Sequence, residues 1–205
     1  VAQYVRARSI PESRRLTTSY SVGFGVAASL WLVSAVVPTP ARFWLWAAAL
    51  VVDVATPLLA SRYLVEAPPH AAHLPERFGL FMIILIGDAM VGVMRGMEDQ
   101  ATWSPDAALS ALFGMGMVFA IWWWYFDGAS SAEERVIRST GETWHYQLWT
   151  YGHLPLYTGI LLAGVGAHHV IAVAGGADHL HAEASWILAG AVALLMISMA
   201  AVAEA

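Results

Sequence analysis

The sequence contains no lysine and no cysteine, and only 12% of its 205 residues carry a charge. Without cysteine the chain can form neither disulfides nor thiolate metal sites, so its redox compartment cannot be inferred from cysteine usage. Without lysine it cannot hold retinal as a Schiff base. A soluble domain normally has about 25% charged residues, so the low charge argues against a soluble fold.

Several motifs of well-known enzyme classes are also absent. The chain has no G-x-x-x-x-G-K-[ST] phosphate loop, no G-x-S-x-G nucleophile elbow and no H-E-x-x-H zinc motif. The sequence therefore assigns no catalytic residue and no cofactor, and it favours a non-enzymatic role. A net charge of −5, with no basic cluster beyond the N-terminal arm, argues against nucleic acid as a partner.

Long apolar runs make up most of the chain, which is 59% hydrophobic with a mean hydropathy of +0.59. Each run approaches the ~20 residues that a helix needs to cross a bilayer. A soluble bundle of such helices would leave too little polar surface to face water. We therefore predict an all-α, polytopic membrane bundle of about six transmembrane helices, with the lipid bilayer as its surroundings.

The prediction divides the chain into an Arg-rich cytoplasmic arm, residues 1–18, and a single transmembrane domain, residues 19–205. Spans are expected at about residues 19–37, 43–59, 76–94, 106–126, 147–173 and 184–203. Ser104 is expected to be the N-cap of the fourth of these helices.

The arginines predict a cytoplasmic N-terminus. In that orientation only Arg42 and Arg95 lie in outer loops, whereas eight arginines lie in cytoplasmic segments, as the positive-inside rule requires. The cytoplasmic set is Arg6, Arg8, Arg14, Arg15, Arg62, Arg77, Arg135 and Arg138.

Ionisable residues within the spans form the candidate site. A charge inside a span costs ~2.5–3.5 kcal/mol, so it needs a partner or a water-filled cavity. The topology brings six residues to a similar depth on the cytoplasmic side: Asp53, His73, Glu76, Arg77, Asp127 and His153. Asp88 and one of the adjacent His168 and His169 would lie further out. If the third helix is regular, then His73, Glu76 and Asp88 share one of its faces.

Three interpretations of this polar set are open. The first is interhelical pairing, such as Glu76 with Arg77 or His153, which is how most intramembrane charges are satisfied. The second is a proton or ion path, with Glu76 and His153 at the inner mouth and Asp88 higher up. The third is a metal centre, as in an intramembrane metallohydrolase, although its H-x-x-E spacing is common by chance. The weak candidate ligands for the metal are His73, Glu76, Asp127 and His153.

Other polar and small residues have narrower interpretations. His168 and His169 point about 100° apart on a helix, so at most one of them faces a given pocket. Ligation of a pigment or haem by either histidine is left open. Four glycines are expected to form helix-packing surfaces: Gly114, Gly116, Gly164 and Gly166.

Five segments carry a resemblance to a known family. Residues 73–88, which read His-Leu-Pro-Glu-Arg-Phe-Gly-Leu-Phe, an aliphatic run and Gly-Asp, resemble the signature of the bacterial low temperature requirement A (LtrA-like) membrane family. Residues 122–127, Trp-Trp-Trp-Tyr-Phe-Asp, and 151–156, Tyr-Gly-His-Leu-Pro-Leu, look like its next two motifs. Residues 31–34 and 53–57 also fit. The resemblance implies a multi-pass protein of the bacterial inner membrane, and it supplies no reaction.

The chain departs from the family pattern in two ways. Gly87 is followed by Asp88-Ala89, where the family usually has Glu-Ser, so the carboxylate is one methylene shorter and a hydroxyl is lost. Family members are also usually longer, so the chain looks like the C-terminal half of a longer protein or a truncated relative.

These observations predict an LtrA-like membrane protein whose Asp/Glu/His cluster conducts or couples a proton or small solute. In that role Glu76 and Asp88 would titrate, His73 and His153 would exchange protons with them, and Arg77 would keep Glu76 ionised. The alternative is a structural or accessory subunit of a larger membrane complex, with other membrane subunits or further copies of the chain as partners.

Overall fold

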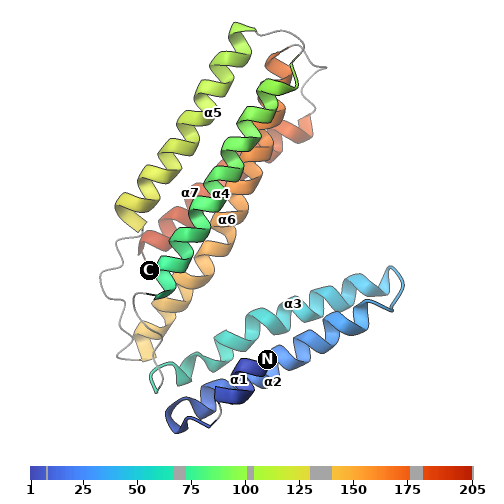
Figure 1. The fold of residues 1–205 in the computed structure, drawn as a ribbon, viewed down its shortest axis with the longest axis vertical. Coiled ribbons are helices and arrows are strands. Elements are labelled where there is room, and N and C mark those ends of the chain that lie inside the picture. The colour runs from blue at the N-terminus through green and yellow to red at the C-terminus, as the bar shows by residue number, and fades with distance from the viewer. Residues whose placement is uncertain (8, 67–72, 101–103, 130–139, 176–181, 205) are drawn as a thin grey trace. The chain divides into compact units, whose positions relative to one another are not determined.

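The computed structural model describes residues 1–7, 9–66, 73–100, 104–129, 140–175 and 182–204, and none of these forms a β-strand. Figure 1 shows the helices in chain order. They are α1 (Ala2–Ala7), η1 (Pro11–Ser13), α2 (Arg14–Ser34), α3 (Ala41–Ala60), η2 (Ser61–Tyr63), α4 (His73–Glu98), α5 (Pro105–Trp124), η3 (Tyr125–Ala129), α6 (Thr140–Ala174) and α7 (Ala182–Glu204).

Six helical segments are long and apolar enough to cross a membrane, which confirms the predicted fold class. They are Pro11–Ser34, Ala41–Tyr63, His73–Glu98, Pro105–Asp127, Glu142–Ala174 and Ser185–Glu204. Arg8, Arg135 and Arg138, which contribute to the predicted orientation, lie outside the described residues, so the cytoplasmic N-terminus stays a prediction.

Some helices begin or end at other residues than the expected spans, because a helix can continue through polar residues beyond its apolar run. The first span was expected at 19–37, but α2 begins five residues earlier, at Arg14, and ends at Ser34. Arginine is a good helix former whose long side chain can reach the membrane surface, so the helix continues into the Arg-rich arm. At the other end, Pro38 disfavours helical geometry at Val37, so the helix does not extend to residue 37 as expected. Ser104 caps α5 as expected, because its hydroxyl oxygen accepts the backbone N–H of Ala107 at 3.1 Å.

The structure divides into two compact units, and the single transmembrane domain expected from the sequence stays a prediction. Unit 1 comprises residues 1–69 and 136–147, and unit 2 comprises residues 70–135 and 148–205. In unit 1, α2 and α3 form an antiparallel hairpin (Figure 1). The two helices approach closely at Gly23, where an added Cβ would overlap the side chain of Thr56.

Unit 2 is held together by close helix approaches at small residues. A Cβ added to Gly92 of α4 would lie 2.7 Å from the carbonyl oxygen of Gly164 in α6. A Cβ on Gly164 would in turn lie 2.9 Å from the Cα of Ala89 in α4. Small residues drive helix association in membranes because they let backbones touch. These contacts fix α4 against α6 along the packed face of α4.

The predicted glycine surfaces are mostly packed against other helices. Gly164 meets α4 as described, and a Cβ on Gly166 would lie 2.8 Å from the Cβ of Leu188 in α7. Gly114 faces Val93, at 3.0 Å from an added Cβ. Gly116 has nothing within 4 Å of such an atom, so this position packs against nothing in the described structure.

Candidate functional site: a buried histidine where three helices meet

His153 of α6 is completely buried, with a relative exposure of 0%. Its Nδ1 lies 2.7 Å from the backbone oxygen of Trp149, one turn earlier in the same helix. A carbonyl oxygen can only accept a hydrogen bond, so Nδ1 must carry the proton. In the neutral ring Nε2 is then an acceptor, and it lies 3.1 Å from the Tyr125 hydroxyl, which donates to it. The two partners thus fix the tautomer of the histidine.

Aromatic side chains enclose this histidine. Phe78 of α4 stacks on the imidazole, with ring centroids 4.4 Å apart and an interplanar angle of 29°. The Trp149 ring lies edge-on at 4.7 Å. Tyr157, one turn further along α6, donates its hydroxyl hydrogen to the backbone oxygen of Phe78 at 3.0 Å. The imidazole is therefore a polar group inside an apolar aromatic shell, where its hydrogen bonds are strong.

The hydroxyl partner of His153 comes from a π-helical turn. The α-helix α5 ends at Trp124, and residues Tyr125–Ala129 continue it as one wider turn. Such single π turns occur frequently at functional sites. Tyr125 is 1% exposed, whereas Asp127, two residues later, is exposed. Tyr125 thus continues the buried face of α5 that carries Val118 and Ile121, whereas the carboxylate of Asp127 lies at the surface of unit 2.

The three segments with the strongest family resemblance meet at this histidine. Phe78 lies in the first segment, Tyr125 in the second, and His153 in the third. His153 could be singled out from the sequence, but its aromatic partners were not predicted. One signal for them was available, since Trp149, His153 and Tyr157 are spaced four residues apart and so share one face of a helix.

The predicted carboxylates are not gathered around His153. His73 and Glu76 form a pair at 3.9 Å, but their side chains are 71% and 68% exposed. Arg77 and Asp88 are also exposed. The predicted pairing of Glu76 with His153 is therefore not seen, and Tyr125 takes that place.

Asp53 belongs to unit 1 and has its own partner there. One of its carboxylate oxygens accepts the indole N–H of Trp31 at 3.1 Å, which links α3 to α2. Among the described residues no three or more His, Asp or Glu side chains lie close enough to hold a metal ion. The weak metal candidates His73, Glu76, Asp127 and His153 are thus not brought together.

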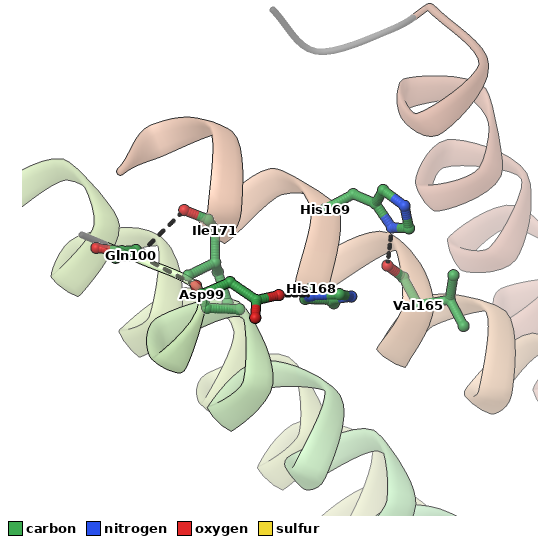
Figure 2. A network of polar contacts seen from close by, with 7 residues as sticks. Asp99, Gln100, Val165, His168, His169 and Ile171 are labelled. Carbon is green, nitrogen blue, oxygen red and sulfur yellow. Dashed lines mark hydrogen bonds and ion pairs between the residues drawn. The ribbon is translucent and has the colours of Figure 1, made fainter. Parts of the chain in front are cut away.

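A second polar network joins α4 to α6 at the far end of the bundle, as Figure 2 shows. His168 Nε2 lies 2.7 Å from a carboxylate oxygen of Asp99. The neighbouring Gln100 donates from Nε2 to the backbone oxygen of Ile171 at 3.2 Å. His169 points away from Asp99, and its Nδ1 lies 2.8 Å from the backbone oxygen of Val165 (Figure 2). Of the two adjacent histidines only His168 faces α4, as helix geometry predicted.

Taken together, the six apolar helices and the polar groups buried between them define a multi-pass helical membrane protein. The chain belongs to the family described as bacterial low temperature requirement A protein (LtrA), whose model matches residues 1–205. This confirms the resemblance seen in the sequence.

One curated relative is an uncharacterised protein of Rhizobium meliloti (strain 1021), which is 29% identical over 177 residues. That match covers 80% of this chain and 42% of the relative, so the chain spans less than half the length of the relative. That it corresponds to a C-terminal half stays a prediction. No solved structure matches the chain.

Proposed function

We propose that this protein of the bacterial inner membrane conducts or couples a proton or small solute, and that His153 is the group that takes up and releases the proton. The supporting observation is a fully buried imidazole with both nitrogens in hydrogen bonds. Ionisable groups at membrane depth are costly and therefore usually functional.

The hydrogen bonds suggest how one proton can be accommodated. In the neutral ring the Tyr125 hydroxyl donates to Nε2. When Nε2 gains a proton it becomes a donor, and the tyrosine oxygen then accepts, so the bond reverses direction while the Nδ1–H bond to Trp149 is kept. The predicted roles of Glu76, Asp88 and the other carboxylates would be to deliver or remove that proton. Asp127 is best placed for this, because it lies on the same π turn as Tyr125.

The test is proton flux in proteoliposomes that contain a trapped pH-sensitive dye and are driven by a potassium diffusion potential. His153→Gln is expected to lower the flux at least tenfold, and Tyr125→Phe, which removes only a hydroxyl, is expected to lower it severalfold. His169→Gln is the matched control, because that histidine is exposed and bonds within its own turn. If His153→Gln folds and conducts like the parent, the proposal is wrong.

A second candidate function, an accessory subunit of a membrane complex, is favoured by a different observation. Asp88 is exposed near the middle of α4, and no polar side chain in the described part of unit 2 forms a hydrogen bond or ion pair with it. An intramembrane carboxylate that faces outward needs a partner from elsewhere. Purification from native membranes in a mild detergent tests this, since a stoichiometric partner is expected and a lone chain would exclude it.

A further inference from the structure

Tyr157 of α6 adds a second hydroxyl to the buried site of His153. It lies one turn after the histidine on the same face of the helix, and it is buried. Its hydroxyl interacts with the hydroxyl of Tyr125, and it also reaches the backbone oxygen of Phe78 at 3.0 Å. Since Tyr125 contacts Nε2 of His153 as well, these groups form a continuous series, called here the hydroxyl chain: His153, Tyr125, Tyr157 and the Phe78 carbonyl.

Each hydrogen of the hydroxyl chain has a definite acceptor when His153 is neutral. Tyr125 donates its hydrogen to Nε2, and Tyr157 donates its hydrogen to the Phe78 carbonyl. A hydroxyl group has one hydrogen. In this state none is therefore left for the contact between the two tyrosine oxygens.

Protonation of His153 changes the direction of donation. The new N–H makes Nε2 a donor, so the oxygen of Tyr125 must accept from it. The Tyr125 hydrogen then turns away from the ring by rotation about the C–O bond, and no O–H bond breaks. A buried donor without an acceptor is costly. The oxygen of Tyr157 is already in contact and can accept this hydrogen, while its own hydrogen stays on the Phe78 carbonyl.

Charged groups are further from the ring than these hydroxyls. The titratable groups that face His153 in the described structure are Tyr125 of η3 and Tyr157 of α6. Ionisable residues at this end of α4, η3 and α7 are all exposed: His73, Glu76, Arg77, Asp127 and Glu204. Inside an apolar shell, hydrogen bonds from an imidazolium are stronger than those between neutral groups. The hydroxyl chain is therefore well placed to stabilise the extra proton.

We propose that Tyr157 is a positioning residue for proton uptake, because its oxygen accepts the Tyr125 hydrogen that a protonated His153 displaces. This rests on the proposed function, in which His153 takes up and releases a proton. It also names the proton, and not a small solute, as the species handled at this site. Rotation of a hydroxyl accommodates a proton without opening the aromatic shell, whereas a solute would have to displace its side chains.

The test is nitrogen NMR of the whole chain in lipid nanodiscs, with isotope-labelled histidine, over a series of pH values. His153→Gln identifies the signal of His153 among the 8 histidines. Tyr157→Phe is expected to lower the proton affinity of His153 at least tenfold, because the displaced hydrogen loses its acceptor. Tyr151→Phe is the matched control. It makes the same chemical change on the opposite side of α6 and should alter the affinity less than about twofold.

A second pair of variants separates this role from a merely structural one. In a Tyr125→Phe background, Tyr157→Phe should change the proton affinity of His153 less than about twofold, because Tyr157 acts through Tyr125. If Tyr157→Phe does not fold, 3-fluorotyrosine at position 157 replaces it. This residue keeps the ring and the bond to Phe78 but has a weaker acceptor oxygen, so it should lower the affinity about twofold or more.

Three outcomes would overturn the role of Tyr157: an unchanged affinity in both Tyr157 variants, an equal loss with and without the Tyr125 hydroxyl, or an equal loss in Tyr151→Phe. Flux that depends on His153 would then leave the proposed function intact. Conversely, if His153→Gln conducts protons like the parent, the proposed function fails even where the titration behaves as expected. An imidazole that stays neutral at every pH at which the parent is folded would overturn both.

Discussion

A single methyl group added at Gly92 should push α4 and α6 apart. The new Cβ would lie 2.7 Å from the carbonyl oxygen of Gly164 and 3.1 Å from its carbonyl carbon. Comfortable non-bonded contacts between heavy atoms are about 3.5 Å or longer, so the backbones would have to separate by roughly 0.8 Å. Neither contact atom belongs to a side chain that could rotate away. Overpacking of this kind costs about 1–3 kcal/mol.

Gly92→Ala also gains about 0.8–1.0 kcal/mol in helix propensity, which would mask part of the steric cost. Gly87→Ala, on the same helix, gains the same propensity but has nothing within 4 Å of the new atom. The difference between the two variants therefore isolates the steric term, so Gly92→Ala should be less stable than Gly87→Ala by about 1–3 kcal/mol.

The assay is reversible unfolding of the detergent-solubilised protein by added sodium dodecyl sulfate, followed by tryptophan fluorescence. Gly116→Ala in α5 is a second control at an open position. Equal stability of Gly92→Ala and Gly87→Ala would show that the close approach of α4 to α6 does not hold unit 2 together, and it would refute the reasoning.

Three further changes test other contacts. Tyr125→Phe leaves the buried Nε2 of His153 without its donor and should lower the free energy of unfolding by about 1–3 kcal/mol, measured by the same titration, with a normal near-ultraviolet spectrum showing that the core is intact. His168→Gln breaks the pair with Asp99, whose side chains are 31% and 60% exposed, so the free energy of unfolding should fall by less than about 1 kcal/mol. Amide hydrogen exchange near Asp99 should nevertheless become faster. Ser104→Ala removes the N-cap of α5 and should cost about 0.5–2 kcal/mol, with faster amide exchange confined to the first turn of that helix; an unchanged exchange rate there would contradict the cap.

Much of the fold could be predicted because membrane-spanning helices are recognisable in a sequence from the length of their apolar runs. An apolar run long enough to cross a bilayer has few alternatives to a helix, and local signals such as Ser104 and Pro38 place the ends to within a few residues. The sequence cannot show in the same way which helix faces which. The runs are apolar on every side, so hydrophobicity alone does not distinguish a face that packs from one that meets lipid.

The candidate site illustrates this limit. Asp88 was expected to face the interior with His73 and Glu76, yet its side chain is exposed, whereas α4 packs against α6 through small residues such as Ala89 and Gly92. Small residues are the better guide in membranes because lipid is as apolar as the protein core. The partner of His153 could not be predicted either: Tyr125 follows the buried Val118 and Ile121 at helical spacing, but the sequence does not show which helix that face meets.

The contact between α4 and α6 also restricts how the two helices can move. Where a backbone rests directly on another backbone, no side chain lies between them to change rotamer and absorb a displacement. Rocking one helix against the other would open an empty gap or force main-chain atoms into each other, whereas sliding along the shallow groove left by the glycines keeps the surfaces in touch. Any rearrangement within unit 2 should therefore appear as a lengthwise shift of α6 past α4, carrying His153 and His168 together.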